Sequence, residues 1–384
     1  MNTESSPVRI LHVLRKMDRG GAEMRTLDLM RNIDRNRYRF EFCCTSGLPG
    51  ELDNEIRELG GRLHYIPLDP RFPGRFSRLL RATPFDVVHS HVHYFSGYIL
   101  RLAAKAGVPG RIAHFRSMTD GHGNNLRRRL QRRLMKGWLN RYATRILGVS
   151  EASLESAWGD RWRRDERCEV IYNGIDAGLF AGPGDRAGVR REFQIPGESP
   201  LCIHVGRMDE AKNHGRLLRI FEHVLKLRPD SYLILAGGGA DGAIERNART
   251  LAADLGIEGR VTFAGTRGDV PRLLAAADLM IFPSLREGLP GAVLEASAAG
   301  APVLASDLPC IVEISQQAPR VYCLSLAATD EAWAGAAVEL MSRRRPEEDP
   351  VKLFDQTCFA MRHCARAFEM VYDGGQPRLE GGAS

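Results

Sequence analysis

The sequence predicts an α/β protein with two domains, each built on a parallel β-sheet that is doubly wound, with helices on both faces. Three observations support this prediction. Short β-rich runs alternate with longer amphipathic runs along most of the chain. One turn-rich stretch near the middle interrupts the alternation. The length of 384 residues exceeds what one ordinary hydrophobic core organises.

The first series of runs ends near residue 150. Its apolar members are expected to be the strands Val8–Leu14, Tyr38–Thr45, Asp86–His89, Arg111–Phe115 and Arg145–Val149. Apolar residues recur at helical spacing between them, in Ala22–Asn32, Glu51–Leu59 and Ser96–Ala106.

The interruption consists of Asn173-Gly174-Ile175-Asp176 and Gly182-Pro183-Gly184-Asp185, which is typical of a linker. The second series then predicts the strands Leu201–Val205, Tyr232–Ala236, Val261–Ala264, Leu279–Phe282 and Val303–Ala305.

These patterns give the expected domain organisation. We expect an N-terminal domain over residues 1–180 and a C-terminal domain over 181–350, facing a central cleft. A last helical run, 351–373, is expected to pack back across the linker. Residues 374–384 are expected to be a disordered tail.

Composition excludes several classes of protein. The chain is 43% apolar and 26% charged, which is ordinary for a soluble globular protein. No apolar run is long enough to span a bilayer, and no basic-then-apolar leader follows Met1, so the sequence predicts a cytoplasmic protein. None of the eight cysteines forms a CxxC pair, which favours buried free thiols over disulfides or a zinc site.

The net charge of +7 is unevenly distributed. Residues 1–180 carry 31 Lys and Arg against 20 Asp and Glu, whereas the remainder carries 23 against 27. We therefore expect the first half of the chain to bind an anionic partner, such as a phosphorylated substrate, a membrane surface or a nucleic acid.

Two glycine-rich turns follow predicted strands, where open α/β sheets bind their ligands. In the first, Gly20 and Gly21 precede a helix, so free N–H groups at its N-terminus could meet a phosphate; a plain tight turn is the alternative. The second, Gly237–Gly242, matches GxGxxG and includes Gly238. Dinucleotide binding is weakly supported, because the next strand offers no acidic residue for a ribose.

A stronger signal follows the strand Leu201–Val205. Arg207 and Lys212 flank a turn that begins at Gly206, and a helix opens at Asn213 or its neighbour. Two cations and a helix N-terminus suit a diphosphate, with Arg as a fork and Lys as a point charge. A solvated surface pair is the alternative.

The most specific constellation contains two glutamates eight residues apart, Glu287 and Glu295, across a strand-to-helix turn. If the run between them were wholly helical, they would lie about 12 Å apart along its axis, at ~1.5 Å per residue. That span resembles the distance from a sugar, across a diphosphate, to a ribose. Carboxylates accept hydrogen bonds from vicinal hydroxyls, so the pair could hold both ends of a nucleotide sugar.

With these motifs in view, the whole chain resembles glycosyltransferase family 4, which has the GT-B fold of two Rossmann-like domains and a retaining mechanism. In their order and residues, its motifs are most similar to those of the capsular and exopolysaccharide branch. The resemblance rests on Gly20-Gly21-Ala22-Glu23, Asn173-Gly174-Ile175-Asp176, Gly206-Arg207 with Lys212-Asn213, and the E-x7-E signature from Glu287 to Glu295.

The resemblance implies a role for each motif. The N-terminal domain would bind the acceptor and the C-terminal domain the donor. Arg207 and Lys212 would bind the donor diphosphate, Glu287 would face the sugar and Glu295 the ribose. The Gly20-Gly21 loop would meet the phosphate, and Gly288, Leu289 and Pro290 would supply or flank backbone donors. The departing phosphate oxygen would take the acceptor proton.

One departure from the family concerns its histidine at the reaction centre. By register that histidine aligns with Arg116, whereas His114 lies two residues earlier on the same face of the strand. We expect His114 to be a candidate catalytic residue and leave open which of the two faces the substrate. No Asp-x-Asp occurs in the chain, so no metal or other cofactor is expected.

The expected activity is hexosyl or N-acetylhexosaminyl transfer from a nucleotide sugar, a UDP-sugar by analogy, to a glycan or lipid-linked acceptor in polysaccharide biosynthesis. A GDP-mannose-dependent mannosyltransferase and a sugar-nucleotide epimerase on the same fold are the alternatives. A nucleic-acid-binding protein is disfavoured, because the basic half lacks the interleaved aromatic residues of a stacking platform.

The basic residues gather between Asn125 and Arg145. This stretch holds eight cations, from Arg127 to Arg145, and no acidic residue. Leu126, Leu130, Leu134 and Trp138 form one apolar stripe at helical spacing. Such a helix can lie on the anionic inner face of a membrane, where each cation contributes about 1 kcal/mol. Alternatively, the stripe packs on the first sheet and the arginines face water.

Overall fold

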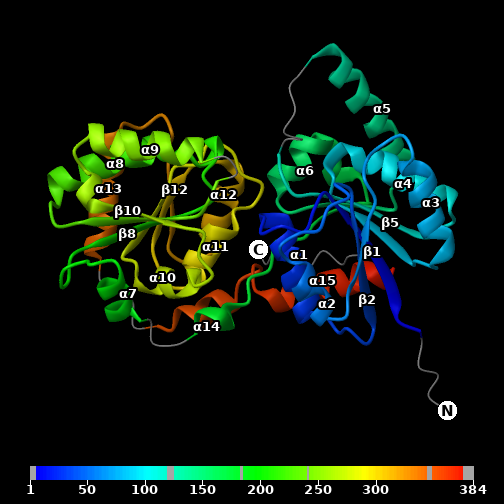
Figure 1. The fold of residues 1–384 in the computed structure, drawn as a ribbon, viewed down its shortest axis with the longest axis horizontal. Coiled ribbons are helices and arrows are strands. Elements are labelled where there is room, and N and C mark those ends of the chain that lie inside the picture. Colours follow the sequence, from blue (N-terminus) through cyan, green and yellow to red (C-terminus); the bar gives the residue numbers. More distant parts are fainter. Residues whose placement is uncertain (1–5, 119–124, 182–184, 240–241, 344–347, 375–384) are drawn as a thin grey trace. The chain divides into compact units, whose positions relative to one another are not determined.

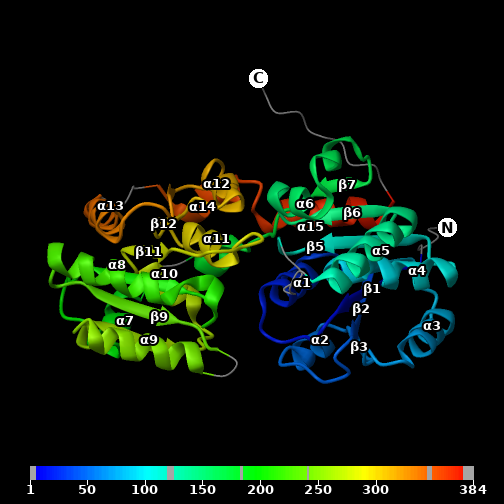
Figure 2. The ribbon, with the colours of Figure 1, turned by 90° about the horizontal axis from the view of Figure 1, so that it is seen from above.

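The computed structural model describes residues 6–118, 125–181, 185–239, 242–343 and 348–374. The chain forms two compact units, and each contains one wholly parallel sheet (Figures 1 and 2). Unit 1 comprises Met1–Gly174 with Met361–Ser384, and unit 2 comprises Ile175–Ala360. The predicted fold class is confirmed.

The sheet of unit 1 has seven strands in the order β3-β2-β1-β4-β5-β6-β7. The chain moves outward from β1 in one direction and from β4 in the other, so β1 and β4 flank the topological switch point. The strands are β1 (Val8–Leu14), β2 (Tyr38–Cys44), β3 (Arg62–Tyr65), β4 (Val87–Ser90), β5 (Gly110–Phe115), β6 (Arg145–Gly148) and β7 (Cys168–Val170).

Helices cover both faces of this sheet, and each face has its own hydrophobic core. One core joins α1 (Gly21–Asn32), α2 (Asp53–Glu58) and α15 (Met361–Tyr372) to the sheet. The other core joins α3 (Phe72–Ala82), α4 (Ser96–Lys105), the C-terminal part of α5 (Leu126–Tyr142) and α6 (Glu151–Trp158).

The six-stranded sheet of unit 2 has the order β10-β9-β8-β11-β12-β13, so β8 and β11 flank its switch point. The strands are β8 (Leu201–Val205), β9 (Tyr232–Ala236), β10 (Val261–Gly265), β11 (Leu279–Phe282), β12 (Val303–Ser306) and β13 (Val321–Leu324).

Helices also lie on both sides of the second sheet. Figure 1 shows α8 and α9 on one side and α7 and α10 on the other. Trp333 of α13 is fully buried in the core that α8, α9 and α13 form with the sheet. The helices are α7 (Arg186–Glu192), α8 (His214–Leu227), α9 (Ala243–Asp254), α10 (Val270–Ala276), α11 (Gly291–Ala298), α12 (Pro309–Ser315), α13 (Asp330–Ser342) and α14 (Pro350–Asp355).

The C-terminal helical run differs from the expected single helix. It is two helices, α14 and α15, because the residues between them pair with the linker. Ile175 N–H donates to the carbonyl of Phe359 at 2.9 Å, and Ile175 forms a β-bridge with Ala360. The chain therefore changes units beside Ile175 and again after Ala360, not after residue 180.

Helix α15 packs tightly where the linker begins. A Cβ atom on Gly174 would lie 2.6 Å from Cβ of Cys364 and 2.9 Å from Cα of Met361, so only glycine fits at this position. The helix contributes Phe368 and Tyr372 to the core of unit 1. Apart from Gly374, the expected disordered tail lies outside the described residues.

Candidate active site

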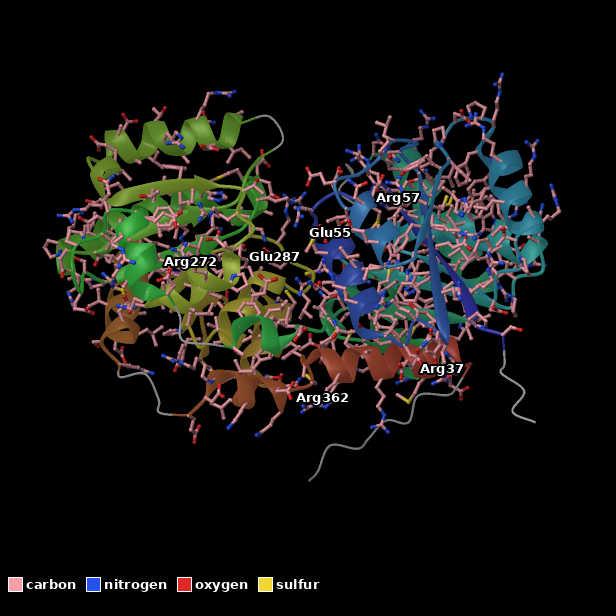
Figure 3. All side chains as sticks on the ribbon, turned by 60° about the horizontal axis from the view of Figure 1, so that its bottom comes forward. Arg37, Glu55, Arg57, Arg272, Glu287 and Arg362 are labelled. Atoms are coloured by element: carbon pink, nitrogen blue, oxygen red, sulfur yellow. The ribbon has the colours of Figure 1, made fainter. Side chains whose placement is uncertain are left out.

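The loops that follow β8 and β11 meet at the switch point of unit 2. Lys212 ends a short 3-10 helix, Glu210–Lys212, and Glu287 follows β11 (Figure 3). The Nζ atom of Lys212 donates to Oε1 of Glu287 at 2.6 Å. Only 15% of the Lys212 side chain and 11% of the Glu287 side chain are exposed, so this is a largely desolvated ion pair.

Backbone contacts fix the two loops against each other. Leu285 N–H donates to the carbonyl of Ala211 at 2.7 Å, and the Asn213 side-chain amide donates to the carbonyl of Pro283 at 3.1 Å. Asn213 adopts a left-handed conformation, with φ of 57°, immediately before α8. Asparagine tolerates this conformation better than most residues. Lys212 is thereby held at the N-terminus of α8, where the sequence predicted it.

The aromatic ring of Phe282 lies beneath the same ammonium group. Lys212 Nζ is 4.9 Å from the ring centroid, close enough for a cation–π interaction. A carboxylate and a ring face thus hold the charge of Lys212 in place.

Arg207 does not join this pair. Its side chain is 72% exposed, and its guanidinium lies 3.5 Å from the carboxylate of Asp209. The sequence predicted that Arg207 and Lys212 converge on one point. Within the described residues, the structure brings Lys212 to Glu287 and leaves Arg207 at the solvent-exposed edge of the same turn.

Close packing accounts for three glycines in the loops of unit 2. A Cβ atom on Gly206 would lie 3.2 Å from the Lys212 side chain, so glycine leaves room for that lysine. Gly237, with φ of 148°, lies so close to Gly206 that a Cβ would be 1.9 Å from its carbonyl oxygen. On Gly238, a Cβ would lie 2.6 Å from Thr266 Oγ1. Close contact between loops thus accounts for Gly237 and Gly238 without a dinucleotide.

The run between the two glutamates is only partly helical. Glu287, Gly288, Leu289 and Pro290 precede α11, and Glu295 lies on α11. The separation of about 12 Å expected for a continuous helix therefore does not apply. Leu289 is buried and anchors the turn.

In unit 1, the Gly20-Gly21 turn opens α1 as predicted. Gly20 is the residue before the helix, and its carbonyl accepts from Met24 N–H at 2.9 Å. A Cβ on Gly20 would lie 2.4 Å from Glu23 Oε2, whereas one on Gly21 would meet nothing within 4 Å. The Glu23 carboxylate is the far end of a flexible side chain and could move, so packing requires glycine at neither position.

Four histidines and one arginine gather at the switch point of unit 1. His12 and His89 are register partners on β1 and β4. Arg116 Nε donates to His91 Nδ1 at 3.3 Å, and His91 Nε2 lies 3.1 Å from His12 Nδ1. Since a guanidinium can only donate, His91 must carry its proton on Nε2 and donate to His12. His12 then carries its proton on Nε2.

A second chain of hydrogen bonds links α15 to β5. The Tyr372 hydroxyl lies 3.0 Å from His89 Nδ1, and His89 Nε2 lies 3.1 Å from His114 Nδ1. Burial, reinforced by neighbouring positive groups, lowers the pKa of His89, His91 and His114 well below the usual value, and that of His12 to about 3. The four imidazoles are therefore neutral at pH 7.

This arrangement places the two candidates, His114 on β5 and Arg116 just after it, differently. His114 is only 1% exposed and packs against Phe368 of α15, whereas Arg116 is partly buried. Direct contact of His114 with a substrate is therefore disfavoured. Tyr372 belongs to the same network, but no sequence signal connected it to β4.

The histidines also raise the question of a metal. Ring nitrogens of His12, His89 and His91 all lie within 4.8 Å of one another. A neutral histidine that binds metal through Nε2 keeps a proton on Nδ1 and donates it to an acceptor. Here Nδ1 of His91 faces the donating, positively charged Arg116. The surroundings of His91 therefore do not fit a cation, and we derive no chemistry through a metal there.

Helix α5 presents its apolar stripe to solvent. The exposed fractions of Leu126, Leu130 and Leu134 are 81%, 69% and 49%. Only the C-terminal end packs, through buried Leu139 and through Trp138, whose ring Arg101 covers at 4.5 Å. Figure 1 shows the first turns of α5 extending beyond the other helices of its unit. The alternative in which the whole stripe packs on the sheet is wrong.

Within the described residues, no helix combines the length and apolarity that crossing a bilayer requires.

Comparison with known proteins agrees with these features. A family model described as "Glycosyl transferase 4-like domain" matches residues 20–174, and one described as "Glycosyl transferases group 1" matches residues 185–350. EpsF of Bacillus subtilis (strain 168) is 33% identical over 91% of this chain and 91% of its own length. A capsular polysaccharide biosynthesis glycosyltransferase, CapH of Staphylococcus aureus, is 29% identical over 88% of this chain and 92% of its own.

Solved structures show the same fold. Anabaena Alr3699/HepE, determined with UDP and glucose, superposes with a TM-score of 0.78 at 19% identity, over 95% of this chain and 99% of its own. WaaG, a glycosyltransferase involved in lipopolysaccharide biosynthesis, gives a TM-score of 0.69 at 17% identity, over 97% and 100%. The two switch points, the E-x7-E glutamates and the match over nearly the whole chain agree: the protein belongs to the glycosyltransferases of group 1, family 4, and has the GT-B fold.

Proposed function

We propose that this glycosyltransferase transfers a hexosyl or N-acetylhexosaminyl group from a nucleotide diphosphate sugar to a glycan or lipid-linked acceptor, with retention of anomeric configuration. The observation that carries the proposal is the desolvated Lys212–Glu287 pair at the switch point of unit 2. In open α/β sheets this is where ligands bind.

The pair has the chemistry that departure of a nucleotide diphosphate needs. A positive charge preorganised in a partly dry site stabilises the developing negative charge of a leaving group. Lys212 supplies that charge, with the N-terminus of α8 beside it. Without donor, Glu287 neutralises Lys212; a bound diphosphate would take its place on Nζ and leave Glu287 to accept hydrogen bonds from sugar hydroxyls.

Retention requires the acceptor hydroxyl to attack the face from which the diphosphate leaves. The bond from the anomeric carbon to the phosphate oxygen breaks, and the bond to the acceptor oxygen forms. The acceptor proton passes to the departing phosphate oxygen, so a side-chain base is not required. Lys212 and exposed Arg207 hold the leaving group, and no metal is assigned to this step.

Relatives suggest the chemical identity of the substrates. The structure of Anabaena Alr3699/HepE contains UDP. An Escherichia coli relative, 28% identical over 60% of this chain, is named as a galactosyltransferase that acts between UDP-Gal and a GlcNAc-diphosphoundecaprenol. These names support a UDP-sugar donor and a lipid-linked diphosphate acceptor in polysaccharide assembly.

Helix α5 supports peripheral binding to a membrane that carries such acceptors. Its exposed leucines are flanked by exposed arginines, including Arg127, Arg129 and Arg133, and no acidic residue lies on the helix. The apolar stripe and the positive charge together match an anionic lipid surface.

The test is a panel of UDP- and GDP-sugars in excess EDTA, with and without a lipid-diphosphate acceptor. Release of nucleotide diphosphate and the anomeric configuration of the product, by NMR, are the readouts. We expect acceptor-dependent release from a UDP-sugar, no loss with EDTA, and a product anomer that matches the donor. An inverted product, or activity that EDTA abolishes and manganese or magnesium restores, contradicts the mechanism. A product that is a free, epimerised sugar formed without acceptor indicates the epimerase instead.

A further inference from the structure

Arg116 is a charged residue that is not part of the proposed donor site in unit 2. It follows β5 in unit 1, and its hydrogen bonds reach His91, which follows β4, and Thr26 of α1. Its guanidinium carries five N–H groups. Three hydrogen bonds are present: Nε to His91 Nδ1 at 3.3 Å, Nη1 to Asn173 Oδ1 at 3.0 Å, and Nη2 to Thr26 Oγ1 at 3.3 Å.

Two N–H groups remain for a ligand. One is on each terminal nitrogen, and neither has an acceptor among the described residues. A guanidinium with one donor left on each terminal nitrogen can bind two oxygens of a phosphate at once.

The charge of Arg116 is also weakly compensated. All three of its acceptors are neutral, because burial keeps His91 uncharged. Burial also lowers the pKa of Arg116 to about 10, and nearby Glu23 and Arg25 act in opposite directions. Arg25 itself pairs with Asp28 at 3.2 Å. A half-buried cation among neutral acceptors favours binding of an anion.

Position distinguishes this arginine from others in the unit. Arg111 lies on the same strand, near its amino end, and donates to the backbone carbonyls of Tyr142, Val108 and Pro109. Arg116 follows the carboxyl end of β5, next to β4 at the switch point, and contacts Thr26 in the second turn of α1. Ligands of open α/β sheets bind beyond the carboxyl ends of the strands.

We propose that Arg116 is the centre of a phosphate-binding site in unit 1, which takes a phosphoryl group of a substrate through its two remaining N–H groups. The site is separate from the Lys212 site of unit 2, and the inference rests on the proposed glycosyl transfer for its role. The phosphoryl group belongs to the diphosphate of a lipid-linked acceptor, because the donor diphosphate is assigned to Lys212 in unit 2.

The test uses the full chain with Arg207→Ala and Lys212→Ala, so that the proposed anion site of unit 2 is removed. Geranyl diphosphate, a soluble prenyl diphosphate, and UDP are titrated separately by calorimetry in EDTA. We expect saturable binding of geranyl diphosphate, weakened at least tenfold by Arg116→Gln. Arg116→Lys, which keeps the charge but loses the fork, should weaken it about threefold or more. Arg111→Gln is the matched control and should leave the affinity unchanged.

The two probes separate an acceptor site from a donor site. Dependence of geranyl diphosphate binding on Arg116 supports the proposal. Dependence of UDP binding alone overturns it, because Arg116 would then bind the donor and not the acceptor. If neither probe depends on Arg116, or if Arg111→Gln weakens binding equally, the proposal is overturned.

Thermal unfolding checks that each variant is folded. Should Arg116→Gln not fold, the Arg116→Lys comparison decides alone, and unchanged affinity in that variant overturns the proposal. Failure of the proposed function gives a different result: UDP binding to a chain with intact Arg116 would not depend on Lys212.

Discussion

Lys212 and Glu287 lie 75 residues apart in sequence and 2.6 Å apart in space. The sequence could predict both residues as parts of a donor site, because each follows a recognisable strand. It could not predict that they pair directly, since this depends on the order β8-β11 in the sheet. Nor could it predict that Arg207 remains exposed, because the direction of an arginine in a turn is set by its tertiary neighbours.

Loss of Lys212 should therefore cost more activity than loss of Arg207. We expect Lys212→Ala to lower turnover by roughly 10²–10³, the usual scale for removal of one preorganised electrostatic donor. Arg207→Ala, which removes a solvated charge, should cost less. Steady-state kinetics on the donor identified by the panel measures both. Lys226→Ala is the control, because this lysine lies on α8 in a surface ion pair. Equal effects of all three changes would refute the assignment of Lys212.

Substitution of Glu287 and of Glu295 should produce different kinetic defects. Glu287→Gln removes a charge beside the reacting sugar and should mainly lower kcat. Glu295→Ala removes a proposed contact to the ribose, which is made equally in ground and transition states, and should mainly raise KM for the donor. The same kinetic defect in both variants would show that they do not hold opposite ends of the donor.

The alternation of side chains along a strand could not predict what covers His114. The alternation of a strand predicts residues 114 and 116 on one face, but β5 ends at Phe115 and Arg116 lies beyond it. What covers that face cannot be read from β5, because the cover is Phe368 and Tyr372 of α15, and Tyr372 lies 283 residues from its partner His89.

At the scale of elements, the central strands were predictable and the short peripheral ones were not. Strands β1, β8, β9 and β11 have the predicted bounds, because strands buried on both faces appear as apolar runs. The prediction missed β3, β7 and β13, three of the four edge strands; the fourth, β10, was predicted. Polar residues interrupt β3 and β7, and β13 is apolar but only four residues long.

Helix α5 was predicted as a helix, and the structure decides which side its stripe faces. We expect the protein to sediment with anionic vesicles at low salt and to be released by high salt, because surface charge attraction is screened. Leu126→Ser with Leu130→Ser should weaken binding by removing apolar burial. Arg127→Ser, Arg129→Ser and Arg133→Ser together should weaken it by removing charge.

The matched control for α5 changes arginines elsewhere in unit 1. Arg57→Ser and Arg75→Ser remove two positive charges from other exposed positions and should leave sedimentation unchanged. Equal recovery on neutral and anionic vesicles, or equal loss in the control, would leave α5 as a solvated surface.

At the scale of the whole molecule, the fold class and the two sheets followed from the alternation of elements. The division of the chain did not, because α15 belongs to unit 1 although it follows unit 2 in sequence. The amphipathic pattern of α15 predicts a helix but does not identify the surface against which it packs.

Buried histidines make stability depend on pH. Their folded pKa values lie below the ordinary 6.5, so the unfolded chain binds more protons as the pH falls below 6.5. The contribution of these histidines should be constant above about pH 7 and fall below it, by up to about 1.4 kcal/mol per pH unit for each histidine, partly offset by Glu169, whose pKa burial raises to about 7. Urea unfolding at pH 7.5 and pH 5 measures this, and His12→Leu should reduce the slope. An unchanged midpoint at pH 5 would refute the account.

The central claim is that Lys212, at the switch point of unit 2, binds the donor diphosphate without a metal. The most direct measurement is calorimetric titration of UDP and of GDP into the full chain in excess EDTA, for wild type, Lys212→Ala and the Lys226→Ala control. The account predicts saturable binding of one nucleotide, at least tenfold weaker in Lys212→Ala and unchanged in Lys226→Ala. Equal affinity in wild type and Lys212→Ala, or binding that appears only when a divalent cation is added, would contradict it.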